Sequence, residues 1–480
     1  MTAQDAVASA VDARVDALAR HWGVDGTIDA LASQLDADPS PHRVWTLLAS
    51  LGAEIPSRRA FRKILRQVAV EGGGAVALEL HHAANELDGA RATRVIRLLS
   101  DATLVDVHDT LATARTSGIQ RVVRETTRRW RDAGHDMRLV RWTADGRGLR
   151  DVLPEEAEAL DAPRDILAAS DPSQVLIPDS GSFAAMELVA EPWRARRLEG
   201  LGVNPGLRVV ALGYDCVPLT SAETASSGIA RQFPMYLHAL ASAQRVVAIS
   251  DAAATEFHGW ARMARSYLGT APEVSAVGLA AEMAPPSADD LREAERALGV
   301  RARRPLVLVV GSHEPRKNHL AVLQAARELW DDGLDFQLGF IGATSWDSDR
   351  FHREVEELQR KRRPVTVLTA ASDRLLAAAY SIATVTVFPS LHEGFGLPVA
   401  ESLVLGTPVV TSGFGSMKQI VDAGGGGVLV DPRDDHSIAD GIRSVLVDAD
   451  LRARLEREAR AREPRRWDDY ADELWKAMFD

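Results

Sequence analysis

The chain contains the stretch Phe388-Pro-Ser-Leu-His-Glu-Gly-Phe-Gly-Leu-Pro-Val-Ala-Glu401, which directly follows the apolar run Ala383-Thr-Val-Thr-Val387. The β-branched run predicts a buried strand, Gly394 and Gly396 allow a sharp turn, and Pro398 suits the first position of a helix. This places Glu393 in a loop and Glu401 in the first helical turn. Because a helix start favours anions, a carboxylate beside it is placed to bond the hydroxyls of a ligand whose phosphates lie nearby. The pattern predicts a site for a nucleotide sugar.

A second loop of similar type lies upstream. The apolar run Pro305–Val310 predicts a buried strand, and it leads into Gly311-Ser-His-Glu-Pro-Arg-Lys-Asn318. Arg316 and Lys317 offer a planar fork and a point charge, the two ways in which proteins hold phosphate. Either loop alone is also typical of an ordinary strand-to-helix turn with a solvated charge. Two such loops in one predicted domain favour a phosphate site.

Together the two loops resemble the donor half of retaining glycosyltransferases of family 4, which have the GT-B fold. The resemblance covers residues 101–480. It implies roles for four side chains: Arg316 and Lys317 contact the donor diphosphate, Glu401 the ribose, and Glu393 the hydroxyls of the transferred sugar. The implied donor site also includes Gly311, Ser312, Gly394, Phe395, Gly396 and Leu397. Many family members have an arginine at the position of Ser312, so one phosphate contact is missing or supplied elsewhere.

Composition limits the class of protein. The 480 residues suggest about three folding units. The formal net charge is -12, which argues against a nucleic-acid partner. The single cysteine, Cys216, excludes an intramolecular disulfide and agrees with a reducing compartment. Because the first residues lack a signal-peptide pattern and no apolar run is long enough for a membrane span, we expect a cytoplasmic protein, with peripheral membrane contact left open.

Residues 1–100 have apolar residues at helical spacing, interrupted by turn signals at Gly23–Gly26, Asp38–Pro41 and Glu71–Gly74. This pattern predicts a bundle of short helices. It is a departure from the family, whose core starts close to the N-terminus. Three roles stay open for this extension: binding of an acceptor or partner, formation of a homo-oligomer, and structural support of the next domain.

Strands alternate with helices through the rest of the chain, which predicts α/β domains with parallel sheets. By the resemblance these are the two facing Rossmann-like domains of GT-B. The expected division is a helical extension at 1–100, an acceptor-side domain at 101–280, a linker at 281–304, a nucleotide-sugar-binding domain at 305–466 and a C-terminal helix at 467–480. The resemblance implies that this last helix crosses back onto the first domain.

A helix is expected to start at Thr116-Ser117-Gly118, where the hydroxyls and the glycine leave free N–H groups facing the loop. By the resemblance, Gly118 lies in a loop that lines the acceptor side and approaches the donor diphosphate. The same helix carries five arginines: Arg121, Arg124, Arg128, Arg129 and Arg131. They form either a solvated polar face or a contact with anionic lipid or a phosphate-bearing acceptor.

Tyr214-Asp-Cys-Val-Pro218 follows the apolar run Leu207–Gly213, at the strand end where parallel sheets gather binding residues. The segment resembles a His-Asp-Leu-x-Pro motif of some family members, with Tyr214 in the histidine position. Asp215 either positions an acceptor hydroxyl or caps the turn before the proline. The catalytic candidates are therefore Arg316, Lys317, Glu393 and Asp215.

The leading hypothesis is a transferase that moves a hexose or deoxyhexose from a nucleotide-diphosphate sugar to a carbohydrate, lipid-linked or protein acceptor. The resemblance implies that it retains the anomeric configuration. Residues 314–318 resemble the segment of mannosyl- and deoxyhexosyltransferases, and this resemblance favours a GDP-linked donor slightly. Arg316, Lys317 and helix-start amides offset the charge on the leaving group, so no metal or other cofactor is expected. A nucleotide-sugar epimerase of related fold and a non-catalytic binding protein are the alternatives. A dehydrogenase is disfavoured because Gly394-x-Gly396 lacks the third glycine of a dinucleotide site.

Overall fold

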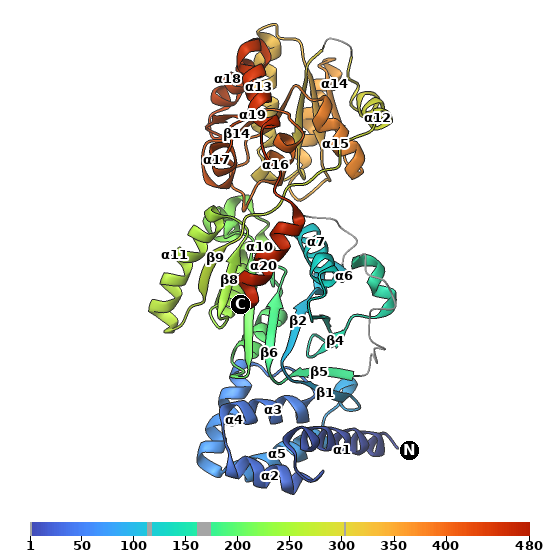
Figure 1. Ribbon diagram of the computed structural model, residues 1–480, viewed down its shortest axis with the longest axis vertical. Helices are drawn as coiled ribbons and strands as arrows, with labels where there is room; N and C mark the ends of the chain where they lie inside the picture. The colour runs from blue at the N-terminus through green and yellow to red at the C-terminus, as the bar shows by residue number, and fades with distance from the viewer. Residues whose placement is uncertain (1, 113–117, 161–173, 302–303) are drawn as a thin grey trace.

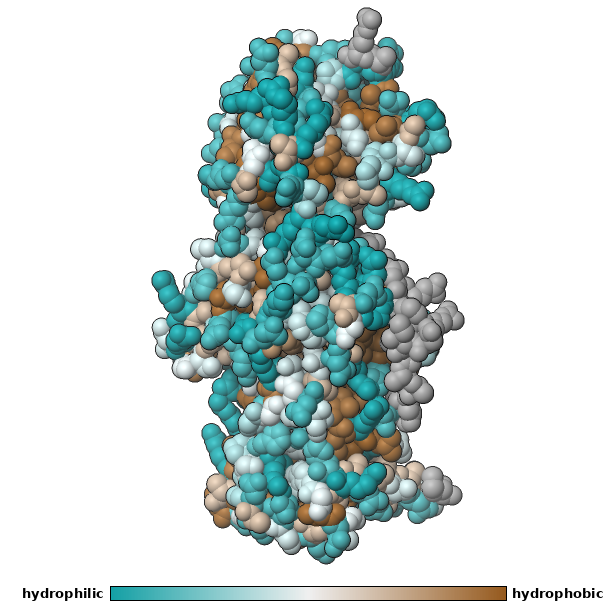
Figure 2. Space-filling view, in the orientation of Figure 1, coloured by the Kyte–Doolittle hydropathy of each residue, from teal (hydrophilic) through white to brown (hydrophobic). Residues whose placement is uncertain are grey.

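A computed structural model describes residues 2–112, 118–160, 174–301 and 304–480. Along the long axis of the molecule, a helical bundle lies at one end, an α/β domain in the middle and a second α/β domain at the other end (Figure 1). Hydrophilic residues cover most of the face seen in Figure 2, with hydrophobic residues in scattered patches. Within the described ranges, no helix is long and apolar enough to cross a membrane.

The predicted N-terminal bundle is confirmed. Residues 3–85, all of which are described, form five helices: α1 (Ala3–Trp22), α2 (Ile28–Ala37), α3 (Pro41–Gly52), α4 (Arg58–Glu71) and α5 (Gly73–Asn85). Hydroxyl side chains cap the starts of three of them, because Thr2, Thr27 and Ser57 each accept a hydrogen bond from a backbone N–H in the first turn. The helix boundaries therefore follow from local sequence.

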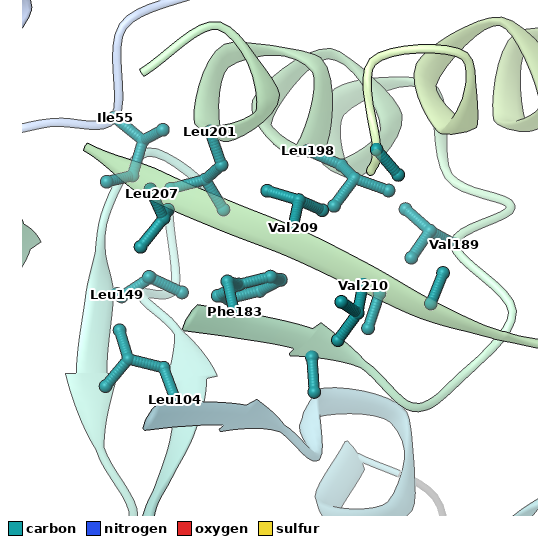
Figure 3. Close-up of a cluster of buried hydrophobic side chains, with 14 of the residues drawn as sticks. Ile55, Leu104, Leu149, Phe183, Val189, Leu198, Leu201, Leu207, Val209 and Val210 are labelled. Atoms are coloured by element: carbon teal, nitrogen blue, oxygen red, sulfur yellow. The ribbon is translucent and has the colours of Figure 1, made fainter. Parts of the chain in front are cut away.

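The bundle shares its hydrophobic core with the middle domain. Figure 3 shows Ile55, from the segment between α3 and α4, beside Leu201 and Leu207 of that domain. The indole Nε1 of Trp45 donates to the Gly200 carbonyl over 2.9 Å. A Cβ at Gly200 would lie 2.0 Å from the carbonyl oxygen of Pro56, so only glycine allows this approach. These contacts favour structural support among the three roles left open for the extension.

The middle domain contains a sheet whose described residues form nine strands in the order β1-β5-β4-β3-β2-β6-β7-β8-β9. The bounds are β1 (Val95–Leu99), β2 (Ala102–Asp106), β3 (Arg138–Trp142), β4 (Leu149–Asp151), β5 (Gln174–Pro178), β6 (Gly181–Ala185), β7 (Leu207–Gly213), β8 (Arg245–Ala248) and β9 (Glu273–Ala276). Neighbouring strands run parallel except at β4, which is antiparallel to β3 and β5. Since β1 pairs with β5, the sheet begins before the expected boundary at residue 100.

Helices cover this sheet (Figure 1). They are α6 (His108–Ala112), α7 (Gly118–Asp132), α8 (Pro192–Gly202), α9 (Val217–Thr220), α10 (Ser227–Leu240) and α11 (Asp251–Leu268). Short 3₁₀ helices occur at η1 (Gly89–Arg91), η2 (Pro154–Leu160) and η4 (Ala222–Thr224). Alternation of strands with helices produced the predicted α/β class.

The second domain contains a sheet whose described residues form six parallel strands in the order β12-β11-β10-β13-β14-β15. The bounds are β10 (Leu306–Val310), β11 (Gln337–Ile341), β12 (Val365–Leu368), β13 (Val385–Phe388), β14 (Val409–Ser412) and β15 (Gly427–Val430). Its helices are α12 (Ala288–Leu298), η5 (Pro315–Lys317), α13 (His319–Asp331), α14 (Asp349–Arg360), α15 (Asp373–Ile382), α16 (Leu397–Val404), α17 (Gly415–Asp422), α18 (Asp435–Val447) and α19 (Ala449–Arg460). All residues of β10, β11, β13 and β14 are buried, as expected of strands covered on both faces.

Two segments connect the domains. Helix α12 was expected in the linker, but it packs against α15, and Leu298 lies in one core cluster with Leu306 and Tyr380 of the second domain. The last helix, α20 (Trp467–Phe479), returns to α7 of the first α/β domain, where the resemblance places it. There the indole Nε1 of Trp130 donates to the Ala471 carbonyl over 2.7 Å.

Candidate active site between the two α/β domains

The two glycine loops of the second domain lie side by side, because they leave the carboxyl ends of β10 and β13, which pair directly. In the loop after β13, Gly396 has φ +100° and stands directly before α16, with Pro398 in the first turn. Residues with a side chain rarely adopt that backbone conformation. Helix α16 begins at Leu397, so Glu401 starts its second turn and not the first turn as expected.

The loop after β10 is held by close backbone packing. Gly311 has φ +145°, and a Cβ at the neighbouring Gly342 would lie 1.8 Å from its carbonyl oxygen. The side-chain amide of Asn318 donates to the carbonyl of Pro389 over 3.2 Å and to that of Pro432 over 2.7 Å. Asn318 therefore ties this loop to the one that carries Glu393.

Three predicted site residues form one buried charge cluster. The Glu393 carboxylate lies 2.6 Å from Lys317 Nζ and 2.5 Å from Arg316 Nη1, and it accepts a hydrogen bond from Ser390 Oγ over 2.6 Å. Burial raises the pKa of Glu393, but Arg316 and Lys317 outweigh it and lower the pKa to about 2. Glu314 also lies 2.6 Å from Arg316. Glu393 is therefore a carboxylate at any physiological pH.

Glu401 has partners other than Arg316 and Lys317. Arg121, on α7 of the first α/β domain, lies 2.7 Å from its Oε1, and the Tyr380 hydroxyl donates to Oε2 over 3.0 Å. The Glu401 side chain is 5% exposed. An ion pair from the other domain thus holds the carboxylate that the resemblance assigns to ribose binding.

The first α/β domain touches the Glu393 loop from the ends of β7 and β8. A Cβ at Gly394 would lie 2.2 Å from the carbonyl oxygen of Tyr214 and 3.2 Å from the Cβ of Asp215. Ser250 Oγ donates to the Gly394 carbonyl over 2.5 Å. Glycine is thus required at position 394 by the approach of the two domains.

Asp215 and Tyr214 have local partners. Asp215 Oδ1 accepts a hydrogen bond from the Val217 N–H over 3.0 Å, which is the turn-capping geometry. Burial raises the pKa of Asp215, and nearby Arg316 opposes this rise. The Tyr214 hydroxyl donates to the Met186 carbonyl over 2.8 Å in the core. The Tyr214 hydroxyl therefore does not point at the charge cluster. Tyr214 occupies the position of the family histidine but does not contact the cluster through its hydroxyl.

The other predicted site residues surround these contacts. Gly118 is exposed at the start of α7, and a Cβ there would lie 3.6 Å from Leu397. The predicted caps Thr116 and Ser117 lie outside the described residues. Phe395 is partly buried against apolar residues of both domains. Ser312 is half-buried, and its carbonyl accepts a hydrogen bond from the Glu314 N–H.

The arginines of α7 are mostly paired. Ion pairs join Arg128 and Arg129 to Glu125, Arg129 to Asp468 of α20, and Arg131 to Asp132. Arg121 is occupied by Glu401, and Arg124 also has a partner. This arrangement favours the solvated polar face over a lipid contact for α7.

Another contact between the domains that was not predicted involves His392. His392 Nε2 lies 2.5 Å from Glu256 of α11, and His392 Nδ1 lies 3.3 Å from Ser221 Oγ. The hydrogen bond to Glu256 raises the pKa of His392 above its ordinary value despite burial. Glu256 also accepts a hydrogen bond from the Cys216 N–H over 2.8 Å. The sequence feature that could have indicated a role for His392 is its position directly before Glu393.

Residues 290–462 match the family model of glycosyl transferases group 1. Among curated relatives, the serotype-specific mannosyltransferase WbdA of Escherichia coli is 31% identical over 212 residues, which are 43% of this chain and 26% of WbdA. The D-inositol 3-phosphate glycosyltransferase of Geodermatophilus obscurus is 33% identical over 228 residues, 43% of this chain and 48% of that protein. The chain thus spans less than half the length of these relatives.

Solved structures confirm the GT-B fold that the sequence predicted. Anabaena Alr3699/HepE, solved in complex with UDP and glucose, superposes with a TM-score of 0.57 at 16% identity, covering 78% of this chain and 98% of that one. WaaG, a glycosyltransferase involved in lipopolysaccharide biosynthesis, superposes with a TM-score of 0.53 at 15% identity, covering 78% of this chain and 99% of that one. Identities this low show the fold alone.

Proposed function

We propose that the chain is a retaining glycosyltransferase that moves a hexose or deoxyhexose, from a GDP-linked donor in preference, to an acceptor hydroxyl. The observation that carries this proposal is the cluster of Arg316, Lys317 and Glu393 in the loops after β10 and β13. The match to glycosyl transferases group 1 covers both loops, and the likeness to WbdA favours a mannose-type donor.

In the proposed reaction, the bond between the anomeric carbon and the diphosphate oxygen breaks. The acceptor oxygen forms its bond to the anomeric carbon on the same face, and the acceptor proton passes to the departing diphosphate. Arg316 and Lys317 hold the diphosphate and stabilise its growing negative charge. Because these two cations supply the charge, the proposal requires no metal or other cofactor.

The protonation states fit this division of roles. Glu393, with a pKa of about 2, accepts hydrogen bonds from sugar hydroxyls and has no proton to give a leaving group. Asp215 is engaged by the Val217 N–H. Neither carboxylate is arranged as the acid of a glycosidase pair, which agrees with a displacement assisted by the leaving diphosphate.

Donor binding can be tested by thermal unfolding with GDP-, UDP- and dTDP-sugars, since a ligand that binds the folded state raises the melting temperature. We expect stabilisation by one nucleotide class, with GDP first. NMR of the product then reports the anomeric configuration, and turnover in EDTA reports metal independence. Release of a free epimer without acceptor would indicate an epimerase. Binding without turnover would indicate a non-catalytic protein, and an absence of stabilisation by every donor would refute the site.

A further inference from the structure

The outer face of α4 carries four exposed cations: Arg59, Arg62, Lys63 and Arg66. In the part of the chain that the structure describes, none of the four forms an ion pair or a side-chain hydrogen bond, whereas Arg58 at the start of the helix pairs with Glu199. We infer that this basic face binds the surface of an anionic membrane. The inference does not depend on the proposed function.

The spacing of the four residues places them on one side of the helix, because residues three, four and seven positions apart lie on the same face. Val70 follows Arg66 by four positions on that face and is 83% exposed. The opposite face, with Phe61, Ile64 and Val68, is buried in the bundle. Packing therefore fixes the helix so that its basic face always points outward.

The basic face of α4 differs from the charge of the chain as a whole and from the arginines of α7. Acidic residues outnumber basic ones, giving a net charge of -12, and the arginines of α7 are largely paired with carboxylates. Like charges three or four positions apart on a helix repel one another. No carboxylate of α4, whose residues are all described, shares this face to offset the repulsion among the four cations. An array of anions facing the helix would offset it.

The shape of the site favours lipid headgroups over other anions. The four cations stand on the exposed side of a helix, and no aromatic residue shares that side of α4 for base stacking, because its one aromatic residue, Phe61, is buried. Val70 adds an apolar side chain suited to the boundary between headgroups and acyl chains. The bundle lies at the end of the molecule farthest from the second α/β domain (Figure 1). Binding there leaves the site between the α/β domains free.

The test is co-sedimentation of the full chain with vesicles of phosphatidylcholine alone or with about 30% phosphatidylglycerol, at low and at physiological salt. We expect binding only to the anionic vesicles, weakened by salt. Each cation near an anionic surface contributes about 5-fold to partitioning. The double variant Arg62→Gln with Arg66→Gln should therefore bind about 30-fold more weakly, and Arg62→Lys with Arg66→Lys should bind like the wild type.

The matched control is Arg350→Gln with Arg353→Gln on α14, where both arginines are exposed and the net charge changes equally. Thermal unfolding confirms that each variant is folded. Equal binding of the two glutamine variants would overturn the assignment to α4. Failure of the wild type to bind anionic vesicles at low salt would overturn the lipid assignment and leave an acidic protein as the occupant of this face.

Discussion

Lys317 and Lys361 form a matched pair of lysines for testing the candidate site. The Lys317 ammonium lies 2.6 Å from Glu393 and the Lys361 ammonium lies 2.6 Å from Glu357. The Lys317 side chain is 10% exposed, and that of Lys361 is 64% exposed. Replacing each lysine by methionine keeps the aliphatic chain and removes the same contact in two different surroundings.

The two substitutions should differ strongly. Lys317→Met removes one of the two cations beside the proposed diphosphate, and one positioned donor to a developing charge is worth about 10²- to 10³-fold in kcat. The fold should survive, because Glu393 keeps Arg316 at 2.5 Å and Ser390 at 2.6 Å. Loss of one buried charge-assisted hydrogen bond costs about 1.5–3 kcal/mol of stability. The exposed pair at Lys361 contributes little to stability and nothing to turnover.

Release of nucleoside diphosphate at saturating donor measures kcat, and urea unfolding measures the free energy of unfolding. Turnover of a folded Lys317→Met variant within about threefold of the wild type would refute the charge-stabilising role, since the expected loss is about 100-fold or more. A similar loss in Lys361→Met would show that the assay responds to lysine removal in general.

Three further predictions concern neighbouring contacts. Arg121→Met leaves the buried Glu401 without its ion-pair partner and should lower the free energy of unfolding by about 3 kcal/mol in urea titration, whereas Arg131→Met should change it little. The pKa of His392 is raised by its hydrogen bond to Glu256, so this pair stabilises the fold fully below the pKa of the unfolded state. The stabilisation is lost as the pH rises through the pKa of the folded state. In His392→Gln this pH dependence of the melting temperature should disappear. Burial lowers the pKa of His313 to about 4, so at pH 5 the unfolded chain binds more protons than the folded chain. The free energy of unfolding of the wild type therefore falls by about 2 kcal/mol at pH 5. His313→Phe should unfold less readily in acid than the wild type.

The sequence predicted strands best where β-branched residues gather. The runs at Leu207–Gly213, Pro305–Val310 and Ala383–Val387 agree with β7, β10 and β13. In contrast, β6 consists of Gly181-Ser-Phe-Ala-Ala185 and β9 is a short edge strand, so neither has a strong strand signal. Their places in the sheet come from pairing with β7 and β8, which local composition does not encode.

The candidate site was predictable within one domain and not between domains. Both glycine loops could be located because each follows an apolar run, and Glu393 meets Lys317 because the strands before the loops pair. The partner of Glu401 could not be found in this way. Arg121 lies 280 positions away in the sequence, and on its own helix it looked like one more surface arginine.

The contacts from the first α/β domain also determine which interactions the proposed donor would displace. Among the contacts that cross to the donor side of the second domain are these three: Ser250 with the Gly394 carbonyl, Glu256 with His392, and Arg121 with Glu401. A ribose bound to Glu401 would compete with Arg121 for the same carboxylate, whereas the Gly394 and His392 contacts involve different atoms. Donor binding would then loosen one of the three contacts and leave two in place. Arg121→Met removes the same contact without a ligand. The variant should therefore show how far this ion pair alone holds the two α/β domains together, apart from any competition with a bound ribose.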